Sequence, residues 1–182
     1  MSKSRKLLEA VLYWTVQLTW GAWITIPGLL VGVFCVVFLK GKPHRNGYGI
    51  IIEIGGNWGG FNLGAISLCG HYATVEHPCY NPDWFDHTRR HEFGHSVQNL
   101  ITGPFTLFWS TIPSVIRYWY QTLRRRRGLQ NTPYDQAIFE YTASSWGYYW
   151  INHIDGSDRP YQFVRRTKKT TSDAIGGNEN DK

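Results

Sequence analysis

The stretch His91-Glu92-Phe93-Gly94-His95 decides how this chain is interpreted. Two histidines four residues apart on a helix lie about 40° apart around the axis and about 6 Å apart along it, so both imidazoles project toward a single cation. Glu92 lies beside that face, where a carboxylate can accept a proton from water at the metal without binding the metal itself. The stretch therefore predicts a zinc site with His91 and His95 as ligands, Glu92 as the general base, and hydrolysis as the chemistry.

The flanking residues predict that this stretch lies well inside a helix. Asn81-Pro82-Asp83 is typical of a turn followed by a helix start, Asp86 falls in the first helical turn, and the next proline is Pro104. Gly94 lowers helix propensity by roughly 1 kcal/mol relative to alanine, a cost that is usually tolerated where another backbone approaches closely. We therefore expect a second element to pack tightly against the helix at Gly94.

Catalytic zinc usually has three protein ligands and leaves the fourth position to water, so a third donor is needed. The candidate is Glu140, in a segment that follows Pro133 and has the pattern of a helix. Small residues share its expected helix face and would let it approach the Gly94 region closely: Ala137, Ala143, Ser144 and Gly147. Two alternatives stay open: Glu140 is solvated or pairs with an arginine, or Asp135 or His153 supplies the third ligand. The sequence therefore predicts Zn2+ held by His91, His95 and Glu140.

The pattern His91-Glu92-x-x-His95 followed by a helical glutamate resembles the zincin metallopeptidases, specifically the gluzincin branch. The resemblance implies that His91, His95 and Glu140 bind zinc, that Glu92 is the general base and proton shuttle, and that the substrate is a peptide or protein. Ser144 stands four residues after Glu140, where the large gluzincins have an acidic residue, so no acidic partner for a histidine ligand is predicted.

A longer part of the chain, about residues 47–150, is also similar to small bacterial membrane proteins of this type. The resemblance rests on residues 91–98 and 117–120, on Gly103-Pro104, and on Ile112-Pro113-Ser114. It implies a membrane-associated zinc peptidase.

The N-terminal part carries the strongest membrane signal. Residues 10–39 have no charged side chain, and residues 19–39 supply 21 positions, enough to cross about 30 Å of hydrocarbon. Tryptophans gather at one end of this stretch and basic residues at the other, as at membrane interfaces. We predict a membrane segment over residues 1–46, formed by one helix or by a hairpin that turns near Pro27-Gly28. A cleaved signal peptide is the alternative, but the stretch is too long and no small-residue cleavage site follows it.

The distribution of basic residues bears on orientation and on a second apolar stretch. Sixteen of the 19 basic residues follow the first stretch, which favours the cell membrane with the catalytic part on its cytoplasmic side. Gly103-Pro104 and Ile112-Pro113 interrupt the second stretch, residues 97–116, and lipid cannot replace the lost backbone hydrogen bonds. We therefore predict an interfacial apolar segment near residues 100–120, with the four arginines at 124–127 at anionic lipid headgroups. The alternative is a buried core helix flanked by solvated arginines.

The expected fold class is α+β. Two β-rich runs, residues 48–54 and 61–69, flank a glycine cluster and predict a small β-hairpin or sheet. The motif helix would then pack against the C-terminal helix as in zincins. The expected domains are the membrane segment 1–46, a metallopeptidase domain over residues 47–160, and a disordered polar tail over residues 161–182.

Other functions are less well supported by the residues. His71, His77, Cys79 and His87 fit no compact second zinc pattern. A catalytically silent membrane scaffold, with or without zinc, is the main alternative to an enzyme. The net charge of +6 suits nucleic acid, but the basic residues flank apolar runs as in membrane anchors, so no nucleic-acid partner is expected. The donor that would stabilise an oxyanion stays open among four residues: Tyr134, Tyr141, Tyr148 and His153.

Overall fold

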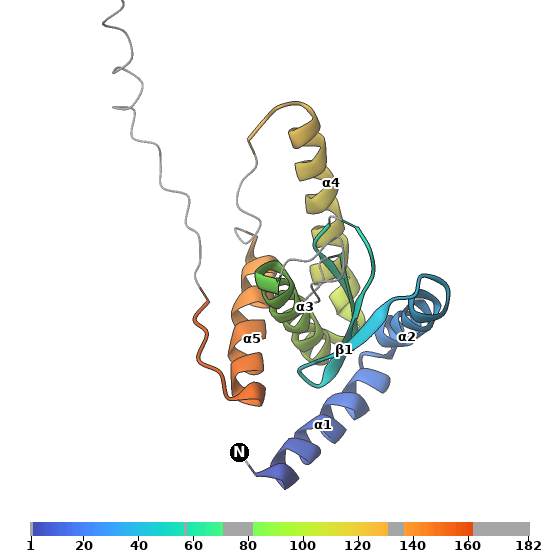
Figure 1. Cartoon of the computed structure of the whole chain (residues 1–182), viewed down its shortest axis with the longest axis vertical. Helices are drawn as coiled ribbons and strands as arrows, with labels where there is room; N and C mark the ends of the chain where they lie inside the picture. Colours follow the sequence, from blue (N-terminus) through green and yellow to red (C-terminus); the bar gives the residue numbers. More distant parts are fainter. Residues whose placement is uncertain (1, 57, 71–81, 131–136, 162–182) are drawn as a thin grey trace, which may run out of the picture.

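The computed structural model describes residues 2–56, 58–70, 82–130 and 137–161 and shows helices packed around a four-stranded sheet (Figure 1). The predicted α+β class is confirmed. In chain order the elements are α1 (Lys3–Leu18), α2 (Ala22–Phe38), β1 (Lys42–Asn46), β2 (Gly49–Glu53), β3 (Gly60–Leu63), β4 (Ile66–Cys69), α3 (Pro82–Thr102), the 3-10 helix η1 (Gly103–Phe105), the π-helix η2 (Leu107–Thr111), α4 (Ile112–Arg126) and α5 (Ile138–Asp155).

The sheet has the strand order β1-β2-β4-β3, which differs from the predicted hairpin. β1 pairs with β2 and β3 pairs with β4 in antiparallel fashion, whereas β2 and β4 are parallel neighbours. Gly47 and Gly64 have φ of +60° and +68° and close the two antiparallel turns in the left-handed region that glycine tolerates. The predicted hairpin between runs 48–54 and 61–69 is therefore wrong. β2 forms a hairpin with β1, the second run forms its own hairpin from β3 and β4, and β2 lies parallel to β4. β3 lies at an edge of the sheet.

The sheet lies between most of α2 and α3. Alternation along β2 places Ile52 in a cluster with Cys35 of α2, and Ile51 in a cluster with Phe85 of α3 on the opposite face. α5 packs in turn against α3, so the layers run α2, sheet, α3, α5 (Figure 1). This arrangement brings the motif helix between the sheet and the C-terminal helix.

The N-terminal apolar stretch forms two helices rather than one. α1 and α2 meet at an angle of 99°, and their length and composition satisfy the requirement for a membrane span only when they are taken together. No single helix within the described ranges is long and apolar enough to cross a bilayer. The predicted turn near Pro27-Gly28 is also wrong, because both residues lie inside α2 and the break lies at residues 19–21.

A buried polar cluster holds this break in place. Asn99 of α3 donates to the Gln17 side-chain oxygen at 2.6 Å, and Thr25 donates to the same oxygen at 2.7 Å. A Cβ on Gly21 would lie 2.5 Å from the Asn99 amide nitrogen, so the corner also needs a residue without a side chain. The motif helix therefore fixes the bend between α1 and α2.

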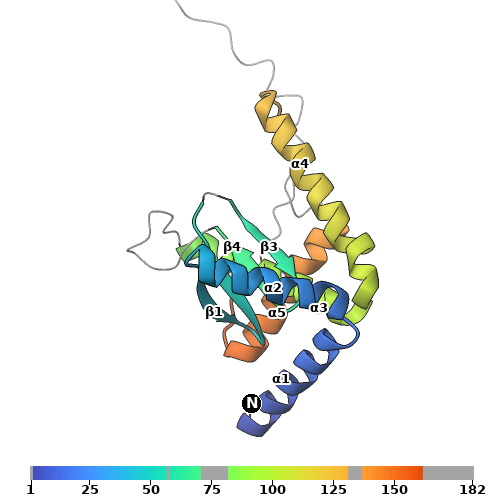
Figure 2. The same cartoon turned by 90° about the vertical axis from the view of Figure 1, so that its right-hand side faces the viewer.

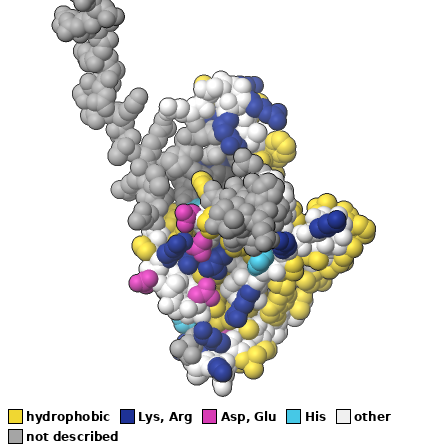
Figure 3. Space-filling view, viewed as in Figure 1, with side chains coloured by type: hydrophobic (Ala, Val, Ile, Leu, Met, Phe, Trp, Pro, Cys, Tyr) yellow, Lys and Arg dark blue, Asp and Glu magenta, His cyan; other side chains and the backbone are white. Residues whose placement is uncertain are grey.

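The second apolar stretch is interrupted at Gly103-Pro104 as predicted, whereas at Ile112-Pro113 the helix changes from π to α without a break. α3 ends at Thr102, Gly103 has φ of +53°, and Pro113 lies in the first turn of α4. Between them the chain forms η1 and η2, and α4 then projects from the body of the protein (Figure 2). Apolar side chains cover much of the surface over α1 and α2 (Figure 3).

Several residues considered in the sequence analysis lie outside the described ranges. They are His71, His77 and Cys79 of the proposed second donor set, Asn81, Pro133, Tyr134 and Asp135, and the polar tail from residue 162 onward.

Candidate metal centre

α3 and α5 bring the three predicted ligands together. One ligand atom each from His91, His95 and Glu140 lie within 4.8 Å of one another, and all three residues are buried. The Glu140 Oε2 atom lies 3.0 Å from His91 Nε2 and 3.3 Å from His95 Nε2, and the two ring nitrogens are 3.2 Å apart. This buried His, His, Glu group could hold a metal ion, as the sequence predicted.

Close packing of two helices makes this cluster possible. A Cβ on Gly94 of α3 would lie 1.7 Å from the Ala143 carbonyl oxygen of α5, and a Cβ on Gly147 would lie 1.7 Å from the Arg90 carbonyl oxygen. The predicted tight contact at Gly94 is therefore confirmed, and the small-residue face of α5 makes it. Glu140 lies one turn before Ala143 on α5, so this contact sets its distance from the histidines.

The donor set fits a tetrahedral zinc ion. Ligands that bind zinc at about 2.0–2.2 Å in tetrahedral geometry lie about 3.3–3.6 Å from one another, close to the separations of 3.0, 3.2 and 3.3 Å. Glu140 is fully buried, yet within the described part of the chain neither of its carboxylate oxygens has a hydrogen-bond donor. The Nε2 atoms of both imidazoles lie at ion-pair distance from Glu140 Oε2, which is expected of groups that converge on a shared cation.

The partners of His95 determine which ring nitrogen carries its proton. Gln98 donates through its amide nitrogen to the Phe139 carbonyl oxygen at 2.7 Å, and a carbonyl can only accept. The Gln98 oxygen therefore faces His95, where it accepts from Nδ1 at 2.8 Å and from the Ser110 hydroxyl at 2.9 Å. With the proton on Nδ1, the lone pair of His95 Nε2 points into the cluster and is available to a metal.

His91 has a serine as its partner. Its Nδ1 lies 2.7 Å from the Ser144 hydroxyl oxygen, which is fully buried on α5. When this hydroxyl accepts the Nδ1 proton, the His91 Nε2 lone pair also faces the cluster. The structure therefore gives this histidine a neutral hydroxyl partner, Ser144.

The two carboxylates of the site differ in their environments. Burial by itself raises the pKa of Glu140, but when protons rather than a metal ion occupy the Nε2 atoms of His91 and His95, these imidazoles outweigh burial and hold that pKa well below its usual range. Burial raises the pKa of Glu92 above its ordinary value, although the same imidazoles act in the opposite direction. Glu140 is thus suited to bind a cation as an anion, and Glu92 to accept a proton.

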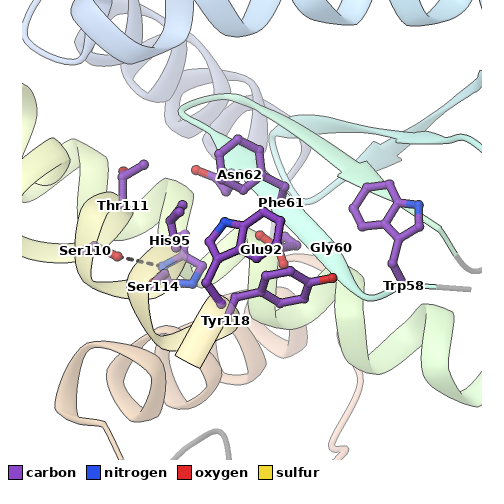
Figure 4. A pocket seen from close by; sticks show the side chains of 12 residues that line it. Trp58, Gly60, Phe61, Asn62, Glu92, His95, Ser110, Thr111, Ser114 and Tyr118 are labelled. Atoms are coloured by element: carbon purple, nitrogen blue, oxygen red, sulfur yellow. Dashed lines mark hydrogen bonds between the residues drawn. The ribbon is translucent and has the colours of Figure 1, made fainter. Parts of the chain in front are cut away.

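Glu92 and His95 lie on the wall of a pocket of about 250 Å³. Figure 4 shows this pocket between the sheet edge and the start of α4. A Cβ on Gly60 of β3 would lie 2.5 Å from Glu92 Oε1, so the carboxylate lies directly against the edge strand. The remaining lining is largely aromatic and hydroxylic: Trp58, Phe61, Asn62, Ser110, Thr111, Ser114, Val115, Tyr118 and Trp119.

Other predicted residues lie away from the cluster. His153 Nε2 faces Glu9 of α1 at 3.6 Å, and the Tyr148 hydroxyl lies 3.0 Å from His87 Nδ1. The Tyr141 ring packs beside the Tyr161 ring, with 6.1 Å between the ring centroids. The residues that line the pocket do not include Tyr141, Tyr148 or His153. The His153 alternative for the third ligand is therefore wrong.

The sequence analysis missed the residues that support the ligands. Gln98 could have been found, because it lies three residues after His95 and thus on the same face of α3. Ser110 and Tyr118 gave no signal, because the path of η2 and α4 places them. Comparisons with known protein families, with curated proteins and with solved structures find no match for this chain.

Proposed function

We propose that this protein is a membrane-associated zinc-dependent peptidase. The observation that carries the proposal is the convergence of His91, His95 and Glu140 with a buried glutamate, Glu92, on the wall of a pocket beside them. When bound, zinc supplies Lewis-acid chemistry, because it lowers the pKa of a water molecule that it binds to about 7 and polarises a carbonyl group.

Glu92 moves the proton in the proposed reaction. Its carboxylate accepts a proton from the attacking water and passes it to the amine that leaves when the peptide bond breaks. Its nearly complete burial and raised pKa favour this role, since a carboxylate poised closer to neutral pH both accepts and releases a proton readily. His91, His95 and Glu140 hold the metal and take no proton in this scheme.

The edge strand and the pocket are suited to an extended peptide. β3 pairs only with β4, so within the described sheet one of its sides is open to a peptide main chain. Tyr118 lines the same pocket as Glu92, and its hydroxyl is the donor that we assign to the developing oxyanion (Figure 4). Exposed apolar side chains on α2 and η2 support membrane association, with lipid as a second partner. The catalytic part is proposed to lie on the cytoplasmic side, because 16 of the 19 basic residues follow the first apolar stretch.

A comparison of the wild-type chain with Glu92→Gln tests the proposal. Both proteins should bind one zinc ion each, because Glu92 is not a ligand, and the variant should hydrolyse a fluorescence-quenched peptide library at least about 10²-fold more slowly. Metal analysis and the rate on one preparation give both numbers. Equal rates in the two proteins would contradict the role of Glu92, and one bound zinc with no hydrolysis by the wild type would favour the silent scaffold.

A further inference from the structure

α2 has one face that is committed to the sheet. A Cβ on Gly28 would lie 2.3 Å from the Leu63 carbonyl oxygen, and a Cβ on Gly32 would lie 3.0 Å from Ile52. Near the C-terminal end of the helix, Cys35 belongs to the core cluster that includes Ile52 and Leu68. The sheet therefore accompanies α2 along most of its length.

This contact is incompatible with α2 crossing a bilayer. The strands packed against α2 would enter the hydrocarbon with it, and the outer edges of β1 and β3 would leave backbone groups there without hydrogen-bond partners. The sheet would also bring with it the buried Glu53 carboxylate and the exposed Lys42 of β1.

The opposite face of α2 is apolar and open. Trp23, Leu30 and Val37 follow one another at intervals of seven residues, and their exposed fractions are 79%, 70% and 60%. Further exposed residues on the same helix are Ile26, Val31, Val33, Phe34 and Phe38. Figure 3 shows this apolar surface continuing over α1, where Leu7, Leu8, Val11 and Leu12 are exposed. So large an apolar surface marks a place of interaction.

The surface extends to the second apolar stretch through the corner between α1 and α2. The Trp20 ring lies edge-on to Phe105 of η1, with 6.5 Å between the ring centroids. Beyond Phe105, exposed large residues continue through Phe108 and Trp109 to Ile116 of α4. In Figure 2, α1 and α2 lie toward the viewer, and the segment from η2 into α4 runs along the right-hand edge of the molecule.

Basic residues border this surface at each end. Lys3, Arg5 and Lys6 begin α1, Lys40 and Lys42 follow α2, and Arg124, Arg125 and Arg126 end α4. Basic residues at both ends of the apolar stretch assign no consistent orientation to a helix that spans the bilayer. A helix that lies in the plane of one leaflet removes the conflict, because both ends then reach the same anionic headgroups.

We infer that the protein is monotopic: the outer faces of α1 and α2, with η2 and the start of α4, insert into one leaflet of an anionic bilayer. The sheet, α3 and α5 stay on the aqueous side of that leaflet. The inference specifies the membrane association within the proposed function and does not depend on the peptidase reaction. Apolar side chains provide the insertion, and the basic residues select anionic lipid.

Nitroxide labels on the outer face of α2 test this mode of binding. Cysteines introduced singly at Trp23, Leu30 and Val37 carry the label, Tyr149 of α5 provides an exposed control, and the unsubstituted chain measures labelling of native cysteines. Accessibility to oxygen and to a water-soluble nickel complex gives the depth of each label in phosphatidylcholine–phosphatidylglycerol vesicles. Substitutions at exposed positions leave the core intact, so each variant should fold.

The expected result is the same shallow depth, about 5–10 Å, at all three α2 positions, with the Tyr149 label in water. A spanning helix would instead separate the labels at residues 23 and 37 by about 21 Å along the membrane normal, with residue 30 deepest, and that profile would overturn the inference. Water exposure of all three labels with vesicles present would overturn it too, together with membrane association. Binding to pure phosphatidylcholine should be at least about tenfold weaker, since each basic residue near an anionic surface contributes about fivefold. Equal binding to both vesicles would contradict the anionic preference. Zinc content and hydrolysis are measured separately, so these outcomes leave the peptidase assignment untouched.

Discussion

Gly94→Ala should separate the two helices that hold the metal ligands. The new Cβ would lie 1.7 Å from the Ala143 carbonyl oxygen, whereas an ordinary contact is at least 3.4 Å, so the backbones must move apart by about 1.7 Å at this point. Glu140 lies one turn from Ala143 and moves with it. Metal–ligand distances tolerate only about 0.2 Å, so the cluster cannot keep its geometry.

The two effects of the substitution on stability have opposite signs. Alanine favours the helix by roughly 1 kcal/mol relative to glycine, whereas an overpacked contact typically costs about 1–3 kcal/mol and a clash with rigid backbone lies at or above the upper end. The net loss is therefore about 2 kcal/mol, which lowers Tm by about 4–8 °C in a chain of this size. We expect zinc affinity to fall by at least about tenfold as well.

Thermal unfolding followed by circular dichroism and zinc competition with a chromophoric chelator measure both quantities. Gly147→Ala meets the same interface, at 1.7 Å from the Arg90 carbonyl oxygen, and should behave alike. The double variant should lose less than the sum of the two single losses, because the first substitution already separates the helices. A Gly94→Ala protein with a raised Tm and unchanged zinc affinity would refute this reasoning.

Three further changes have defined outcomes. Ser144→Ala should lower zinc affinity by about 10–100-fold because the first histidine loses its Nδ1 partner, whereas the matched change Ser145→Ala should leave the affinity unchanged in the same chelator competition. Gly60→Ala should reduce kcat by about tenfold or more at unchanged zinc content, since its Cβ would displace the general base; Gly59→Ala meets no atom within 4 Å and is the control. Asp86→Asn should lower stability near neutral pH. Burial raises the pKa of Asp86, but two arginines outweigh it and the net pKa is lowered, so the carboxylate stabilises the fold above its ordinary pKa of 3.8 and loses this effect as pH falls through the lower folded value. Chemical unfolding at several pH values should show the gap between variant and parent closing in acid, and a gap that widens there would contradict the sign.

The parts of the site that local patterns encode were predictable. The spacing of His91 and His95, the helix boundaries near Pro82 and Pro104, and the small-residue face around Glu140 all depend on periodicity within a single helix. Gly94 added the one long-range clue, because a glycine inside a helix indicates a close neighbour. The cluster of three ligands follows from these features together.

The parts that depend on distant residues were not predictable. Asn99 fixes the break between α1 and α2 from about 80 positions away, and apolar residues on both sides of the break gave no sign of it. The pairing of β2 with β4 is likewise non-local, because β2 already forms a tight hairpin with β1 and β4 forms one with β3. Ser110, whose hydroxyl lies 3.0 Å from His95 Nδ1, belongs to the π-helix η2, a conformation that residue patterns rarely indicate.

The close contact between α3 and α5 explains why the partner of His91 is a short, neutral side chain. The Gly94 backbone nearly touches the Ala143 carbonyl of α5. The next residue of α5 is Ser144, and its short side chain places a hydroxyl oxygen 2.7 Å from His91 Nδ1. An acidic side chain in that position is longer and would push α5 away, and Glu140 with it. A helix pair packed through glycine therefore suits a metal site in which a short, uncharged side chain supports the histidine. The absence of an acid at residue 144 is thus compatible with a complete metal site, because the glycines have already brought the third ligand within reach.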